Sequence, residues 1–160
     1  RHRARPKGER RMLRLSKKTW LALEAVVDIA INARPNPVQS KEITKRQGIP
    51  QRYLEQVMQQ LVHAGILKGV RGPRGGYTLA RERRRIPVGE VVRVVGAMEA
   101  SDEPANSVPS DLGERVIAPL WQDVQRELMK KLDGITIEDM CRKAEEAGVE
   151  NSRLNADFTI

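Results

Sequence analysis

Apolar residues recur every three to four positions over most of the chain, which is the spacing of amphipathic α-helices. The first such segment follows Ser16, a suitable N-cap, and stops in the proline-containing stretch 34–37. Its apolar positions are Trp20, Leu23, Val27, Ala30 and Ile31. We therefore expect a first helix that starts at about Ser16.

The segment 40–64 has the pattern of two helices joined by a tight turn. Ser40 is a second N-cap candidate, and Gly48 suits the left-handed position that ends a helix. Pro50 fits the first turn of the next helix. That helix has an apolar stripe at helical spacing, made of Leu54, Val57, Met58, Leu61 and Val62. This order predicts a helix-turn-helix.

The other side of this third predicted helix is polar. Arginine and glutamine side chains can bind base edges with two hydrogen bonds, and the start of a recognition helix enters the major groove. Alone, such a face is typical of an ordinary solvated helix, but its neighbours favour DNA recognition. The polar positions are Gln51, Arg52, Tyr53, Gln56, Gln59 and His63.

Two short alternating runs, 66–70 and 77–80, predict a β-hairpin after the helix-turn-helix. The sequence RGPRGG joins them, with Pro73 and three glycines to form a tight turn and with Arg71 and Arg74 to meet a phosphate backbone. No Gly-Lys-Ser/Thr follows, so the spacing excludes a nucleotide-binding P-loop. A basic hairpin directly after a helix-turn-helix is typical of a winged DNA-binding domain.

The remaining sequence predicts two further structural units. Pro87 opens a valine-rich helix, and the Ser-, Pro- and Asp-rich stretch 99–113 predicts a loop. A long helix then follows, which starts or kinks near Pro119. Its apolar seam predicts a dimer contact formed by Val116, Leu120, Trp121, Val124, Leu128 and Leu132, together with Ile117. Gly134 ends that helix, and Thr136 caps a last one that includes Cys141.

We therefore expect a mainly α fold with a small β-hairpin: a winged helix-turn-helix domain plus a long C-terminal dimerisation helix. The predicted parts are a basic arm or upstream remnant at 1–11, the DNA-binding domain at 12–98, a loop at 99–113, dimerisation helices at 114–147 and a tail at 148–160.

The two parts of the chain on either side of Arg85 have net charges of opposite sign. Of its 160 residues, the first 85 contain 21 Lys/Arg and 6 Asp/Glu, a net charge of +15, whereas the rest contain 8 and 15, a net charge of −7. A basic half of this size attracts polyanions, with nucleic acid the first candidate and an anionic membrane the second. No apolar run approaches the ~20 residues of a membrane span. We expect a soluble, cytoplasmic protein that binds double-stranded DNA.

Residues for catalysis or metal binding are scarce. The chain has one cysteine, Cys141, so no intramolecular disulfide can form, and its two histidines, His2 and His63, are far apart. The sequence shows no pairing of a nucleophile with a base. We therefore expect that the protein is not an enzyme and has no metal site and no cofactor. The apolar helix face around Cys141 favours a small core residue, with a redox switch as the alternative.

In these features the chain resembles the Rrf-two (Rrf2) family of bacterial winged helix-turn-helix transcription regulators, over about residues 12–144. The most specific match pairs YLEQ at 53–56 with VRGP at 70–73 and GGY at 75–77. The first helix, IPVGEVVRVV at 86–95, LWQDV at 120–124 and ITIEDM at 135–140 also match.

The resemblance implies a homodimer in which the long helix crosses its twin and two wings meet a palindromic operator in the bacterial nucleoid. Two departures from the family pattern are Thr19-Trp20-Leu21, where Gly-Arg-Tyr is usual, and Arg74 in place of a wing glycine. The residues expected at the DNA are Lys17, Lys18, Gln51, Arg52, Tyr53, Gln56, Arg71, Gly72, Arg74 and Tyr77.

Cluster-binding members of that family have three cysteines between the positions of Met98 and Trp121, and this chain has none there. An iron-sulfur cluster needs thiolate ligands or histidine. We therefore expect a cofactor-free regulator, most simply a repressor. The sequence leaves open whether its control comes from a docked partner protein, a small-molecule effector or oxidation of Cys141.

Overall fold

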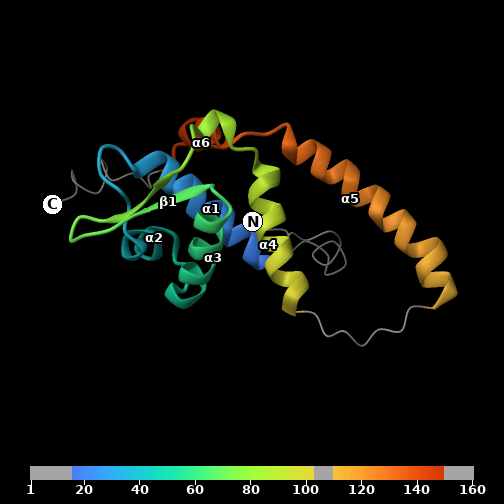
Figure 1. Cartoon of the computed structure of the whole chain (residues 1–160). Coiled ribbons are helices and arrows are strands. Elements are labelled where there is room, and N and C mark those ends of the chain that lie inside the picture. The colour runs from blue at the N-terminus through green and yellow to red at the C-terminus, as the bar shows by residue number, and fades with distance from the viewer. Residues whose placement is uncertain (1–15, 103–109, 150–160) are drawn as a thin grey trace, which may run out of the picture.

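The structure is a computed structural model that describes residues 16–102 and 110–149 (Figure 1). It is mainly helical with one two-stranded antiparallel hairpin, as the sequence predicts. The predicted arm 1–11 and most of the predicted tail lie outside the described residues. The elements are α1 (Lys17–Asn32), α2 (Ser40–Gln47), α3 (Gln51–His63), β1 (Leu67–Val70), β2 (Gly76–Leu79), a 3₁₀ turn (Arg83–Arg85), α4 (Val88–Asp102), a π turn (Gly113–Ile117), α5 (Ala118–Asp133) and α6 (Ile137–Glu146).

Helix α1 lies at the centre and packs against α2, α3, α4, α6 and β2. Its start is confirmed: the Ser16 side chain accepts a hydrogen bond from the Thr19 backbone N–H at 3.2 Å. The buried face differs from the predicted stripe, because Trp20 is 59% exposed. The small alanines instead face the core, since several elements crowd around one helix. That core face consists of Ala22, Ala25, Val26, Ile29 and Ala30.

The helix-turn-helix is present with two shifted boundaries. Ser40 is the first residue of α2 rather than its N-cap, because the Glu42 carboxylate accepts the Gln39 backbone N–H at 2.8 Å and so caps the helix one residue earlier. Pro50 likewise directly precedes α3. Gly48 has the predicted left-handed conformation, with φ of 68°. The apolar stripe of α3 is buried as predicted, apart from a half-buried Val62.

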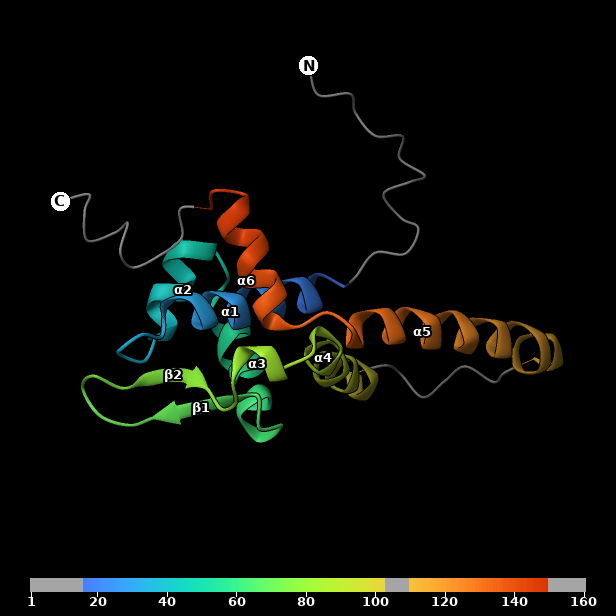
Figure 2. The same cartoon turned by 90° about the horizontal axis from the view of Figure 1, so that it is seen from above.

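The hairpin is fixed to the body near the start of α2. Strands β1 and β2 pair from Leu67 opposite Leu79 to Val70 opposite Gly76. Val38, in the segment before α2, makes two backbone hydrogen bonds with Tyr77, at 2.9 and 2.8 Å. A Cβ at position 76 would overlap the Val38 carbonyl, so this close approach requires glycine. Figure 2 shows the hairpin beside α3.

Helix α5 extends away from the other helices (Figures 1 and 2). The predicted loop 99–113 was too long, because α4 continues to Asp102 and helical structure begins again at Asp111. Serine and aspartate cost little at the end of a helix that is already formed. The predicted irregularity near Pro119 is confirmed as the π turn, in which the Ala118 N–H bonds the Gly113 carbonyl. Within the described residues, no helix is both long and apolar enough to cross a membrane.

Candidate nucleic-acid interface

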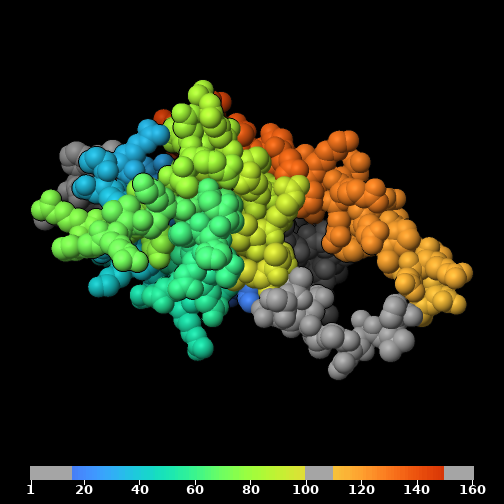
Figure 3. Space-filling model, in the orientation of Figure 1, coloured from blue at the N-terminus to red at the C-terminus, as the bar shows by residue number. Residues whose placement is uncertain are grey.

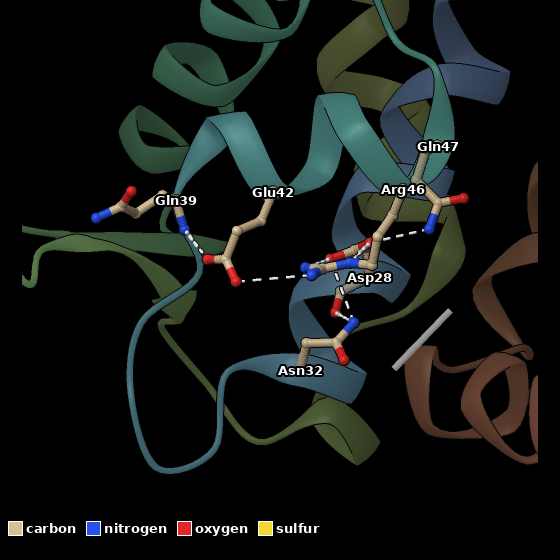
Figure 4. Close-up of polar contacts among 6 residues, drawn as sticks. All are labelled: Asp28, Asn32, Gln39, Glu42, Arg46 and Gln47. Atoms are coloured by element: carbon tan, nitrogen blue, oxygen red, sulfur yellow. Dashed lines mark hydrogen bonds and ion pairs between the residues drawn. The ribbon is translucent and has the colours of Figure 1, made fainter. Parts of the chain in front are cut away.

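A buried polar network connects α1 to α2 and thereby fixes the helix-turn-helix (Figure 4). Arg46 donates two hydrogen bonds to the fully buried Asp28 carboxylate, at 2.9 and 2.8 Å. Gln47 donates a third at 2.9 Å, and the Asn32 amide donates to the Asp28 carbonyl at 3.0 Å. The bond to Asp28 is the main reason that the pKa of Arg46 is raised. A buried charge is tolerated here because it is paired.

This network was not predicted from the sequence. The available signal was Asp28 itself, a charge inside the most apolar segment of the chain. Such a residue needs a buried partner. Periodicity gives no information on which residue of another helix supplies it.

The polar face of α3 points outward. Gln51, Arg52 and Gln56 are exposed, as are Gln59 and His63 further along the helix. The Gln51 side chain donates to Glu55 at 3.3 Å. In the view of Figure 3, α3 and the hairpin lie on the same face of the molecule, with the hairpin at its edge. The helix-turn-helix therefore exposes the predicted recognition helix, with the hairpin beside it.

Tyr53 differs from its neighbours on α3 because its side chain is half-buried. Its hydroxyl is buried and makes no hydrogen bond to a described residue. Burial, followed by the charge of Glu99, raises the pKa of Tyr53 to about 12. The Lys18 Nζ lies over the ring, 5.9 Å from its centroid. The Tyr53 ring thus connects α3 to Lys18 of α1 through a cation–π contact.

Lys18 lines a groove between α3 and α4, together with Gln56 and Met98. Lys17, the first residue of α1, is exposed. Both lysines therefore stand at the start of α1, and Lys18 is close to α3. Of this predicted pair, Lys18 is the one that the structure places beside predicted recognition residues, next to Tyr53 and Gln56.

The wing tip is basic and exposed. Arg71 and Arg74 are both exposed, and the turn between them closes through a 2.9 Å hydrogen bond from the Gly75 N–H to the Gly72 carbonyl. Gly72 has φ of 111°, a conformation that favours glycine. The Gln39 side chain donates to the Pro73 carbonyl at 3.5 Å, which connects the tip to the start of α2. Tyr77 is half-buried and anchors the hairpin through its backbone.

The predicted dimer seam is exposed in the single chain. Leu132, the last seam residue, is half-buried against the core. The other seam residues are exposed to solvent. An exposed apolar row of this length usually marks a contact surface. The exposed fractions are 54% for Val116, 53% for Ile117, 60% for Leu120, 51% for Trp121, 40% for Val124 and 47% for Leu128.

The residues present do not fit a cysteine-ligated cluster. Cys141 is buried in α6, and burial is the main cause of the raised pKa of its thiol. A raised pKa disfavours the thiolate that metal binding and oxidation require. Residues 16–102 and 110–149 contain no group of three His, Cys, Asp or Glu side chains able to hold a metal ion.

The sequence model of the Rrf2 family, described as an iron-dependent transcriptional regulator, matches residues 15–143. The chain belongs to the Rrf2 family. It is 32% identical over 144 residues to the HTH-type transcriptional regulator IscR of Cronobacter sakazakii, with 89% of each chain covered. It is 33% identical over 134 residues to IscR of Xenorhabdus nematophila, covering 83% of this chain and 82% of the relative.

Two solved structures of regulators have a similar fold. IscR of T. potens matches with a TM-score of 0.68 and 38% identity, over 85% of this chain and 91% of that one. CymR, the global cysteine regulator of B. subtilis, matches with a TM-score of 0.63 and 28% identity, over 82% and 98%. This Rrf2 protein is a DNA-binding transcription regulator with a winged helix fold, and its relatives are regulators rather than enzymes.

Proposed function

We propose that this Rrf2 protein binds a palindromic operator as a homodimer and represses transcription without an iron-sulfur cluster. The observation that supports it most is the long apolar seam of α5, which one chain leaves in water. A second copy supplies an identical seam, and twofold symmetry makes the two self-complementary. A dimer in turn requires two half-sites related by the same symmetry.

The proposed DNA contacts fall into two groups. Arg52 and Gln56 read base edges, because their exposed side chains can form paired hydrogen bonds in the major groove, with Gln51 beside them. Phosphate contacts come from Lys17, Lys18, Arg71 and Arg74. Gly72 lets the wing backbone approach the duplex, whereas Tyr53 and Tyr77 hold Lys18 and the wing in place.

We propose repression because a dimer that covers both half-sites excludes other proteins from the same base pairs. The signal is then a small-molecule effector or a partner protein. The absence of cysteines from the stretch 99–113 leaves no thiolate ligands there, and the burial of Cys141 weighs against the redox alternative.

Selection from random-sequence DNA tests the proposed recognition. We expect the wild-type chain to enrich a motif of two inverted half-sites, centred about one helical turn or a multiple apart. The variant Arg52→Ala should enrich a less specific motif with the same symmetry. If the wild type enriched no motif or an asymmetric one, the proposed function would be wrong.

A substitution in the seam tests the homodimer. Trp121→Glu places a charge in the apolar row, so we expect its sedimentation to show a monomer where the wild type is a dimer. The matched control is Gln125→Glu, which adds the same charge to an exposed polar position of α5. Equal masses for Trp121→Glu and wild type would exclude this seam as the dimer contact.

A further inference from the structure

The junction between α5 and α4 is held by more interactions than chain connectivity requires. Backbone hydrogen bonds run from the Val88 N–H to the Ile135 carbonyl at 2.7 Å and from the Ile137 N–H to the Ile86 carbonyl at 2.9 Å. They join the segment at the start of α4 to the segment between α5 and α6. The C-terminal end of α5 is therefore attached to the N-terminal end of α4.

A bidentate ion pair adds a second connection one turn further along α4. The Arg93 guanidinium donates to both carboxylate oxygens of Asp133, the last residue of α5, at 2.8 and 2.6 Å. Such a paired geometry fixes direction as well as distance, because the two planar groups must align. As both side chains are about half exposed, its contribution to stability is small. The main effect of the pair is to fix the direction of α5 relative to α4.

Gly89 lets the two helices approach closely enough for this pair to form. It is buried in the first turn of α4, and a Cβ at this position would overlap the Asp133 carboxylate. A methyl group here would move Asp133 away from Arg93. We call Gly89, Arg93 and Asp133 the α4–α5 joint.

The other end of this connection is the DNA-binding body. Val91 and Val95 of α4 are buried in the core, and α4 packs against both α1 and α3. The direction of α5 is thus coupled through α4 to the orientation of the recognition helix. Figure 2 shows α5 projecting from the body beyond this joint.

We propose that the α4–α5 joint sets the direction of α5 relative to α3, and so determines which spacing of operator half-sites the dimer accepts. This inference rests on the proposed homodimer. With a rise of ~1.5 Å per residue, a 16-residue helix turned by about 10° moves its far end by about 4 Å. That exceeds the ~3.4 Å between base pairs. The joint residues position the recognition helices without touching DNA.

The test measures binding of the full chain to duplexes that contain the selected half-sites with spacers shortened or lengthened by one base pair. Wild type should prefer one spacer by roughly tenfold or more, because only one geometry engages both half-sites. Gly89→Ala and Arg93→Met should reduce that preference to roughly threefold or less and retain affinity for an isolated half-site. The matched control is Arg126→Met, which removes an exposed arginine from α5 that pairs only with Asp123 among the described residues. It should behave as wild type.

If Arg93→Met and Gly89→Ala kept a spacer preference as sharp as that of wild type, the proposed role of the joint would be wrong. A wild type that binds the selected half-sites as a monomer would instead overturn the proposed dimer. A second measurement needs no DNA: spin labels at Gln56→Cys, in a Cys141→Ala background, report the distance between the two recognition helices. We expect one narrow distribution, broadened by Arg93→Met and unchanged by Arg126→Met.

Discussion

Arg74 and Gln56 have different predicted roles although both are exposed and polar. Arg74 lies at the wing tip, where it meets phosphate, so Arg74→Ala should weaken binding to all sequences about equally and lower the salt slope by about one. Gln56→Ala on α3 should instead relax base preference at one position of each half-site. Titrations on specific and random duplexes at several salt concentrations distinguish the two. An equal loss on every sequence for both variants would contradict this division.

Tyr53 is expected to act through its ring rather than its hydroxyl. Because that hydroxyl is buried and makes no hydrogen bond to a described residue, Tyr53→Phe should keep operator affinity and stability near neutral pH. The raised pKa of Tyr53, about 12, favours the neutral form in the fold. Wild type should therefore lose stability as the pH rises from about 10 through 12, and the phenylalanine variant less so. Denaturant unfolding across this range measures the difference. A large loss of affinity in Tyr53→Phe at neutral pH would show that the hydroxyl contacts DNA.

At the residue level the structure tests exposure, and the DNA contacts stay a prediction. Arg52, Gln56, Arg71 and Arg74 are exposed, which DNA contacts require. Trp20 shows the limit: it has helical spacing with the core residues, yet it is 59% exposed. An apolar stripe identified from the sequence can be wider than the helix face that is buried. Packing against the neighbouring helices decides which edge of the stripe is covered.

Among the elements, α1 and α2 depend on the network at Asp28. Asp28→Ala leaves Arg46 without its buried partner, which costs about 3–5 kcal/mol in the free energy of unfolding. This is a large part of the ~5–15 kcal/mol typical of a domain. Chemical denaturation measures it. A fitting control is Arg142→Met, which breaks the exposed pair with Glu138 and should cost less than about 1 kcal/mol. Similar losses for both would mean that the network does not stabilise the helix-turn-helix.

Element order and type could be predicted because each helix has its own periodicity and its own start and stop signals, such as the N-cap Thr136 and the C-cap Gly48. Boundaries were less accurate. Capping at Gln39 depends on the side chain of Glu42, and the continuation of α4 to Asp102 depends on a helix already formed. The wing anchor between Val38 and Tyr77 joins residues far apart in sequence, so no local pattern indicates it.

For the whole molecule, the uneven distribution of charge and the exposed seam favour the same arrangement of the proposed dimer. The basic part, residues 1–85, contains the helix-turn-helix and wing, whereas α5 follows in the acidic part, which DNA repels. In the proposed dimer, contact through α5 brings the acidic parts together and leaves both predicted recognition helices available to DNA. The sequence predicted this division, but not the joint at Gly89, because neither spacing nor composition shows which helix ends meet.

The most direct measurement of the central claim is the mass of the complex formed on a duplex that contains one selected palindrome. We predict two chains for each duplex, and a loss of this complex in Trp121→Glu at concentrations where Gln125→Glu still forms it. One chain on each duplex, or equal affinity of Trp121→Glu and wild type for the palindrome, would contradict a homodimer that reads its operator through two recognition helices.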